Sequence, residues 1–291
     1  MRNNMKIRKG LMLGAALTAV AMCGAPEAAR ATPAGLTFYP ATDIYGKGNF
    51  HFDSDQFFGS GSRTTATAIG LEYGTGPDRD GVLGRSEFGI DYITGGSGFS
   101  NNISGSKRVL FNAKTQLFNN DKSATRLVAG VWGVGARGNL SSGNTVFPPN
   151  VGYLLASKNF TFGRIHAGVA HSFANKAVIT TPGGNDDRTY LQLGYDRVLN
   201  KKFQVTVDFY SGKSAASVFA PGIIYYMNEK SDFQLGYIRF NDKSIKPRNQ
   251  IYLGFDYNFG GETAPPAATP ASPVAPATNG GTATNGTKTT E

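Results

Sequence analysis

The residues from 251 to 259 alternate strictly between apolar and polar side chains. Apolar or aromatic residues occupy every second position, namely Ile251, Leu253, Phe255, Tyr257 and Phe259. The positions between them are filled by Tyr252, Gly254, Asp256 and Asn258. Because successive side chains of a strand point to opposite faces, this pattern predicts a β-strand with one apolar face and one polar face.

The same alternation recurs along the chain, and helical periodicity is nearly absent after the first thirty residues. It predicts about twelve strands, at residues 44–54, 63–73, 82–94, 107–118, 124–137, 150–157, 161–173, 188–199, 203–211, 218–227, 232–240 and 249–259. Three of these segments, 124–137, 151–157 and 218–227, carry apolar residues on both faces. We therefore expect an all-β fold built from antiparallel strands over residues 44–259.

The N-terminal segment has the features of a secretory signal peptide. Basic residues precede an apolar run from Leu11 to Cys23, and Ala29 and Ala31 supply a small-x-small cleavage site. The run is shorter than the ~20 residues that a spanning helix needs. A lipoprotein signal at Cys23 is the alternative, although Met22 stands where a small residue is wanted. We predict removal of residues 1–31, followed by a lead-in over residues 32–43.

Removal of the signal changes both the charge and the thiol content of the chain. The segment holds five of the 29 Lys and Arg residues and one of the 20 Asp and Glu residues, so the mature net charge falls from +9 to +5. This dispersed excess gives no reason to expect nucleic acid as a partner. Cys23 is the only cysteine, so we expect neither a disulfide nor a thiolate metal site in the mature protein.

The terminal aromatic strand, the signal peptide and the loop lengths together resemble bacterial outer-membrane β-barrels of the porin-like class. From the fourth predicted strand onward, short connections alternate with mostly longer ones, as periplasmic turns alternate with external loops in such barrels. The resemblance implies an up-and-down transmembrane barrel in the outer membrane with both mature termini in the periplasm. It also implies that Tyr257 and Phe259 form the signal read by the barrel-assembly machinery, with membrane lipid and lipopolysaccharide as further partners.

Charged residues share the face opposite the apolar one on most of the predicted strands. A wet lumen inside a lipid-facing wall accounts for both faces at once. The pore-lining candidates are Glu72, Arg85, Glu87, Asp91, Lys114, Arg126, Arg164, His166, Asp196, Asp208 and Asp256. Their mixed signs fit either a narrow channel for small polar or ionic solutes or a closed lumen braced by ion pairs. The small strand number argues against a wide diffusion pore.

Other chemistry finds little support in the sequence, and we expect no cofactor, no metal site and no catalytic residue. A lipid hydrolase needs a His and a Ser on one face, but His171 and Ser172 are adjacent, and His51 shares its face with Asp53 rather than with Ser54. The glycine motif at 133–138 is followed by a loop rather than by the helix of a dinucleotide site. The acidic stretches 78–81 and 185–187 complete no calcium loop and are interpreted as turns.

The last thirty residues differ in composition from the rest. Residues 260–291 are rich in Ala, Pro, Thr, Asn and Gly and carry almost no large apolar side chain, so we expect a disordered periplasmic tail. Peptidoglycan is the candidate partner of this tail. The rival functions are a structural or surface-interaction barrel, an outer-membrane lipid hydrolase and a secreted β-sandwich.

Overall fold

The computed structural model describes residues 34–59, 66–77, 80–95, 109–135, 150–174 and 176–261. The predicted signal peptide, with Ala29 and Ala31, lies outside these residues, as does the tail from residue 262 onward. Twelve long strands make up most of the described chain: β1 (Asn49–Gly59), β2 (Ala66–Thr75), β4 (Ser86–Gly95), β5 (Val109–Asn120), β6 (Thr125–Val134), β7 (Val151–Phe160), β8 (Gly163–Ser172), β9 (Thr189–Asn200), β10 (Phe203–Tyr210), β11 (Val218–Tyr226), β12 (Ser231–Phe240) and β13 (Asn249–Gly260).

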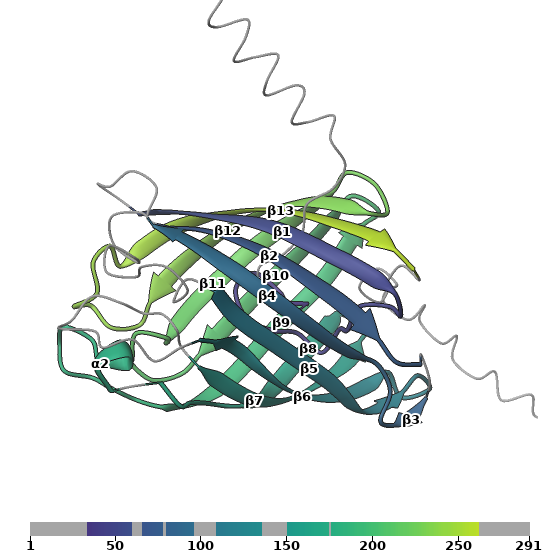
Figure 1. Ribbon diagram of the computed structural model, residues 1–291, viewed down its shortest axis with the longest axis horizontal. Coiled ribbons are helices and arrows are strands. Elements are labelled where there is room, and N and C mark those ends of the chain that lie inside the picture. Colours follow the sequence, from purple (N-terminus) through teal and green to yellow (C-terminus); the bar gives the residue numbers. More distant parts are fainter. Residues whose placement is uncertain are drawn as a thin grey trace, which may run out of the picture.

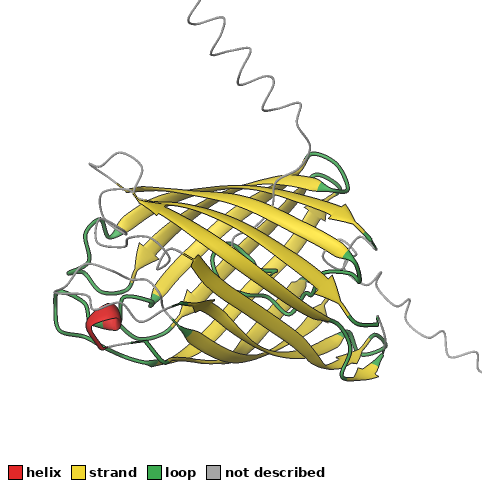
Figure 2. Cartoon of the chain, in the orientation of Figure 1, coloured by secondary structure: helices red, strands yellow, loops and turns green. Residues whose placement is uncertain are grey.

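Each strand pairs antiparallel with its neighbours in sequence, and the sheet closes on itself. Strand β1 pairs with both β2 and β13, and the order runs from β5 through β4, β2, β1 and β13 down to β6. Pairing of β5 with β6 completes the ring. Figures 1 and 2 show the resulting tilted barrel. Closure gives each of the twelve long strands a hydrogen-bonded neighbour on both sides, so none of them is an open edge.

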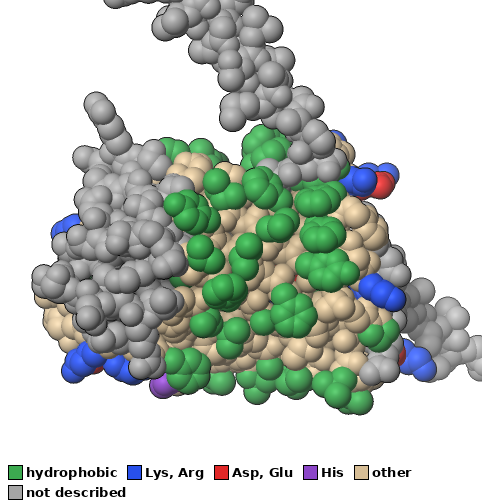
Figure 3. Space-filling model, viewed as in Figure 1, with side chains coloured by type: hydrophobic (Ala, Val, Ile, Leu, Met, Phe, Trp, Pro, Cys, Tyr) green, Lys and Arg blue, Asp and Glu red, His purple; other side chains and the backbone are tan. Residues whose placement is uncertain are grey.

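The alternation in the sequence becomes the inside and the outside of this barrel. Along β12 the burial alternates from Asp232 onward, with Phe233, Leu235 and Tyr237 pointing outward at 49%, 49% and 38% exposure. Figure 3 shows hydrophobic side chains spread over the strand surface and Lys and Arg side chains near its two ends. An apolar band between polar ends is the surface that a lipid bilayer requires.

The predicted all-β barrel of about twelve strands is confirmed, with differences at the edges of elements. Strand β1 begins at Asn49 rather than at residue 44, and the two-residue strand β3 (Gly81–Val82) adds to β5 before β4 begins. The four-residue helix α2 (Lys176–Ile179) lies in the loop between β8 and β9. No helix in the described parts of the chain is long and apolar enough to cross a membrane.

The two ends of the barrel carry connections of different length. The turns at 121–124, 161–162, 201–202 and 227–230 are short and lie at one end, where β1 also begins and β13 also finishes. The exception at this end is the longer connection 76–85 between β2 and β4. Loops 173–188, 211–217 and 241–248 are longer and lie at the other end. In the closing strand, Phe259 stacks on Phe50 with ring centroids 5.4 Å apart, and Tyr257 is only 9% exposed.

Candidate functional site

The charged residues predicted to line a pore face the inside of the barrel. All are buried except Arg126, whose side chain is 30% exposed. They are Glu72, Arg85, Glu87, Asp91, Lys114, Arg126, Arg164, His166, Asp196, Asp208 and Asp256. Whether they line a path for solutes stays a prediction, because a segment of the chain itself lies against several of them.

Residues 34–48 fold back into the lumen as a short hairpin, which we call the lumenal hairpin. Gly35 and Pro40 form an antiparallel bridge, and the amide of Leu36 donates to the carbonyl of Tyr39. The green loop inside the ring of strands in Figure 2 belongs to this segment. The hairpin enters from the end with short turns and places its tip, residues 37–39, toward the end with long loops.

The two limbs of the lumenal hairpin are the residues before and after its tip. An ion pair of the barrel wall binds the backbone of both. Lys114 and Glu87 lie 3.0 Å apart and are both almost fully buried. Glu87 accepts hydrogen bonds from the amides of Ala34 and Tyr45, at 2.9 and 3.0 Å. Lys114 donates to the carbonyls of Ala34 and Ala41, at 2.8 and 3.1 Å. Because these hydrogen bonds are made with backbone atoms of the hairpin, they do not depend on which side chains the limbs carry.

The tip is bound in the same way by the opposite part of the wall. Asp208 accepts hydrogen bonds from the amides of Thr37 and Phe38, at 2.7 and 2.6 Å. Gln192 donates to the carbonyl of Pro40 at 2.8 Å. A carboxylate that accepts several backbone amides is a strong, charge-assisted anchor for the tip.

Aromatic rings of the wall pack around the tip of the lumenal hairpin. Tyr39 stacks on Tyr210 with ring centroids 3.4 Å apart, and its hydroxyl donates to the carbonyl of Ala216. Phe38 and Tyr39 both meet the edge of Trp132, at 6.1 and 5.5 Å. Burial raises the pKa of the Tyr39 phenol well above its ordinary value, so Tyr39 stays neutral.

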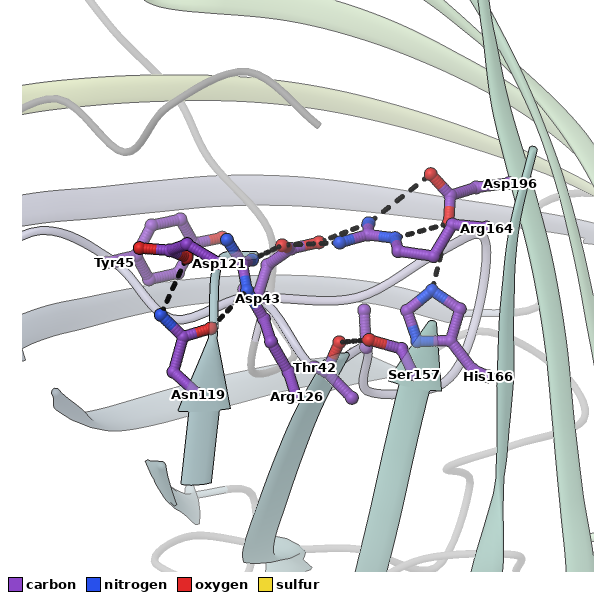
Figure 4. A network of polar contacts seen from close by, with 12 residues as sticks. Thr42, Asp43, Tyr45, Asn119, Asp121, Arg126, Ser157, Arg164, His166 and Asp196 are labelled. Carbon is purple, nitrogen blue, oxygen red and sulfur yellow. Dashed lines mark hydrogen bonds and ion pairs between the residues drawn. The ribbon is translucent and has the colours of Figure 1, made fainter. Parts of the chain in front are cut away.

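Asp43 connects the hairpin to two arginines of the wall, as Figure 4 shows. Its Oδ1 lies 2.7 Å from Arg126 and 2.7 Å from Arg164, and its Oδ2 lies 2.5 Å from Arg164. Burial alone raises the pKa of Asp43, but the Arg164 and Arg126 guanidinium groups outweigh it and hold the pKa well below its usual range. Asp43 is therefore ionised whenever the hairpin is in place.

Arg164 also binds the wall behind it, so the network extends away from the hairpin. Its Nε donates to Asp196 at 2.8 Å, and the same Asp196 oxygen lies 2.9 Å from Nε2 of His166. Nearby, the hydroxyls of Thr42 and Ser157 lie 2.6 Å apart. Figure 4 shows the side chains of Arg164, His166 and Asp196 gathered beside Asp43.

The lumenal charges are separated into two sectors of the wall. Lys114 on β5, Arg126 on β6 and Arg164 on β8 form a basic sector. The acidic sector lies on β13, β1, β2 and β4 and consists of Asp256, Asp53, Asp55, Glu72 and Asp91. Because β8 and β1 lie on opposite sides of the ring, Arg164 faces the acidic sector across the lumen. The separation of sign is incomplete, since Asp196 on β9 and Asp208 on β10 are acidic and Arg85 directly precedes β4.

The arrangement does not assemble the parts of a hydrolase among the described residues. His171 is exposed while Ser172 is buried, so they point to opposite faces. The nearest approach to a triad is Ser157 opposite His166, with Asp196 beside it. However, Nδ1 of His166 has no hydrogen-bond partner in the part of the chain described, so it does not activate Ser157.

The remaining motifs have structural roles where the structure describes them. Gly133 and Val134 end strand β6, and residues 136–138 of the glycine motif lie outside the described residues. Asp187 accepts from the amide of Lys213, and Asp186 pairs with Lys176. Residues 78 and 79 are not described, and Asp80 accepts from the amide of residue 121. Within the described ranges, no group of three His, Cys, Asp or Glu side chains is placed to hold a metal ion.

The lumenal hairpin differs from the sequence prediction, which gives residues 32–43 only as a lead-in to the first strand. A signal was available, since residues 36–45 include Phe38, Tyr39 and Tyr45 yet show no alternation. Large aromatic side chains in a segment without strand periodicity indicate packing against another surface. What the sequence could not indicate is which surface that would be.

A closed barrel with an apolar exterior and a charged interior defines the class of protein: a transmembrane β-barrel. No protein-family model and no curated protein sequence matches the chain. Solved structures similar to it include the KdgM porin, at 10% identity over 72% of this chain and 99% of that one, with a TM-score of 0.44.

Two further similar structures are an outer-membrane channel from Pseudomonas putida F1 and the NanC porin. The first is 12% identical over 78% of this chain and 99% of that one, with a TM-score of 0.43. The second is 12% identical over 72% of this chain and 100% of that one, with a TM-score of 0.42. At these values nothing about the solute follows from the likeness.

Proposed function

We propose that the protein is a narrow outer-membrane channel for small ions and polar solutes, closed in this structure by the lumenal hairpin. The lumenal hairpin, rather than side chains of the wall alone, fills the barrel, and this filling carries the proposal. Eight strands enclose only enough room for their own side chains, and larger barrels enclose more. Here the room is taken by a separate segment, joined to the wall through one end at Asn49 and through non-covalent contacts.

Displacement of the hairpin would leave a passage with a charged lining. The wall groups that bind it, Glu87, Lys114, Asp208 and Arg164, would then face water. Facing walls of opposite charge orient a small polar solute and favour ions over apolar molecules. Conduction therefore requires the hairpin to shift, and its ion pairs set how often that happens.

A disulfide between hairpin and wall tests this directly. Residues 34–261 contain no cysteine, so a Thr42→Cys, Ser157→Cys double variant adds the only two thiols there. The two hydroxyls it replaces lie 2.6 Å apart, which makes the pair a suitable candidate for a disulfide. We expect planar-bilayer conductance to be absent in the oxidised variant and to return when a reductant is added.

The single variants Thr42→Cys and Ser157→Cys are the matched controls, because neither can form the link within one chain. They should conduct equally with and without reductant. Equal conductance of the oxidised and reduced double variant would contradict gating by the hairpin. Absence of conductance in every folded form would favour the second candidate, a structural barrel, which the same network of ion pairs in the lumen supports.

We further infer that the end with short turns, and with it both mature termini, faces the periplasm. Short turns at 121–124, 161–162, 201–202 and 227–230 support this orientation by analogy with barrels in general. A protease site inserted between Gly183 and Gly184 should be cut on intact cells, and one inserted between Lys201 and Lys202 should not. The reverse pattern would overturn the orientation.

The partners remain part of the proposal. Lipopolysaccharide and lipid would contact the apolar band, and the assembly machinery would read Tyr257 and Phe259. Peptidoglycan would be met by the tail beyond residue 260, an idea supported only by the position of the tail after the closing strand. Deletion of residues 262–291 should leave conductance unchanged and reduce the protein recovered with the cell wall; unchanged recovery would remove this partner.

A further inference from the structure

Four carboxylates form a row across neighbouring strands on the acidic side of the lumen. Asp232 on β12 is paired in register with Asp256 on β13, and Asp256 with Asp53 on β1. Gly70 on β2 follows, and it is paired with Asp91 on β4. Directly opposed residues of antiparallel strands have Cβ atoms about 4.5–5.5 Å apart. We call Asp232, Asp256, Asp53 and Asp91 the carboxylate row.

Asp53 lies near the middle of this row, and no described side chain balances its charge. It is 0% exposed, and neither of its two carboxylate oxygens has a hydrogen-bond partner in the described parts of the chain. Oδ1 of Asp91, which is also buried, lacks a partner there as well. A buried carboxylate without a partner is strongly disfavoured, and like charges opposite one another add to the cost.

The neighbours of Asp53 receive hydrogen bonds from neutral groups. Asn112 donates to Asp91 at 2.8 Å, and Gln234 donates to Asp256 at 2.6 Å. Tyr252 donates to Asp55, which lies two residues beyond Asp53 on the same face of β1, at 2.7 Å. Amide and phenol donors are neutral, so these three hydrogen bonds bring no positive charge to the carboxylates.

The cations of the basic sector are engaged on the other side of the lumen. Lys114 binds Glu87 and the hairpin carbonyls, and Arg126 binds Asp43. Arg164 divides its guanidinium between Asp43 and Asp196. These three side chains are therefore engaged with partners other than Asp53.

We propose that the carboxylate row binds a small inorganic cation at the two unpartnered oxygens of Asp53, drawn there by the negative charge of Asp256 and Asp91 on either side. Gly70 contributes no side chain to the space between Asp53 and Asp91. Because no three carboxylates among the described residues already converge as metal ligands, the ion is held mainly by charge and by a few oxygens rather than by a closed cage.

Calcium is the ion expected to bind best. It accepts irregular sets of oxygen ligands at about 2.3–2.6 Å, whereas magnesium demands a near-ideal octahedron and gives up its water reluctantly. The oxygens of Asp53 are shielded from solvent, which favours the ion that loses water more easily. Binding of the cation does not depend on the proposed channel function. Its consequence, a preference for cations over anions in conduction, rests on that function.

The test measures thermal unfolding of the folded barrel in detergent as calcium chloride is added to a choline chloride buffer of constant ionic strength. Choline is too large to replace the ion, so it controls for screening. The wild type should show a saturable rise in melting temperature with calcium, and a smaller rise with magnesium or potassium. Asp53→Asn should bind calcium roughly tenfold more weakly or worse, because ligand charge sets affinity in such sites.

Asp186→Asn is the control, since it makes the same change at a carboxylate in the loop between β8 and β9, away from the lumenal hairpin and from the carboxylate row. It should keep the response to calcium. In a chelator, Asp53→Asn should melt higher than the wild type, because it removes an unbalanced charge. No calcium response in the wild type, or equal responses in both variants, would overturn the site.

Bilayer recordings then separate this inference from the proposed function. A salt gradient across the membrane should give a reversal potential that favours cations, and Asp53→Asn should shift it toward zero. Loss of all conductance with an intact calcium response would overturn the channel and leave the site. Conductance with no calcium response would overturn the site and leave the channel.

Discussion

Replacement of Asp43 by alanine should release the lumenal hairpin while leaving the barrel wall intact. Asp43 makes three contacts with guanidinium groups, one to Arg126 and two to Arg164, all at 2.5–2.7 Å. Arg164 is only 5% exposed, and after the change it would retain Asp196 alone. Since Asp43 is the hairpin residue that joins these arginines, its loss should weaken docking more than it weakens the sheet.

The size of the effect follows from the burial of each pair. Arg126 and Asp43 are both 30% exposed, so their pair contributes about 0.5–1 kcal/mol. Removal of one partner from a buried, hydrogen-bonded pair costs about 2–5 kcal/mol, and the lower end applies because Asp196 remains with Arg164. A total of about 3 kcal/mol corresponds to roughly a hundredfold shift toward the released hairpin.

Single-channel recording measures this shift as open probability, and the only tryptophan supplies a second readout. Trp132 is 4% exposed and packs against Tyr39, so release should shift its emission to the red and increase quenching by acrylamide. Asp186→Ala removes an exposed ion pair with Lys176 and should change neither signal. A folded Asp43→Ala barrel with the open probability of Asp186→Ala would refute the reasoning.

Three further predictions concern pH, the wall and the lipid face. The pKa of Asp43 is depressed in the docked hairpin and near its ordinary ~3.9 in the released one, so docking is strongest above pH ~4 and weakens as pH falls below it. Open probability should therefore rise between pH 6 and pH 3, and an equal rise in Asp43→Asn would contradict this cause. Gly236→Ala would place a Cβ 2.5 Å from Cγ2 of Thr37. It should therefore weaken docking of the lumenal hairpin by about 1–3 kcal/mol and expose Trp132. Unchanged acrylamide quenching of Trp132 would argue against close packing of the tip on β12. Leu235→Arg should lower the free energy of unfolding by about 2–4 kcal/mol, measured by urea unfolding from lipid vesicles, because Leu235 faces the membrane near the middle of β12. An effect no larger than that of Leu235→Ala would place Leu235 outside the bilayer.

The barrel could be predicted because its signal is local. In β12 and β13 the alternation of apolar and polar residues fixes which side chains point outward, and nothing distant is needed to recognise it. The inward direction of Lys114, Arg164 and Asp256 follows from the same rule. The start of β1 was placed too early because residues 44–48 precede the alternation and belong to the hairpin.

The lumenal hairpin could not be predicted because the hydrogen bonds and ion pairs that hold its limbs and tip to the wall join residues distant in sequence. The amide of Thr37 meets Asp208 across 171 positions, and Asp43 meets Arg164 across 121. The segment lacks the length and periodicity of a strand, so its position is decided by the space that closure of the barrel creates. Its aromatic residues indicate that it packs, but not that it packs inside.

The fold class, the two faces of most strands and many of the inward charges follow from the sequence. Asp53, Asp55 and Asp232 also turn inward, although they are not among the predicted pore-lining residues. The grouping of the charges follows from the closed barrel. Asp53, Asp91, Asp232 and Asp256 are far apart in the chain, and they form one row because the register of β12, β13, β1, β2 and β4 aligns them. A period of two is a property of each strand alone, whereas register and lumen filling arise only when all strands have closed into the barrel.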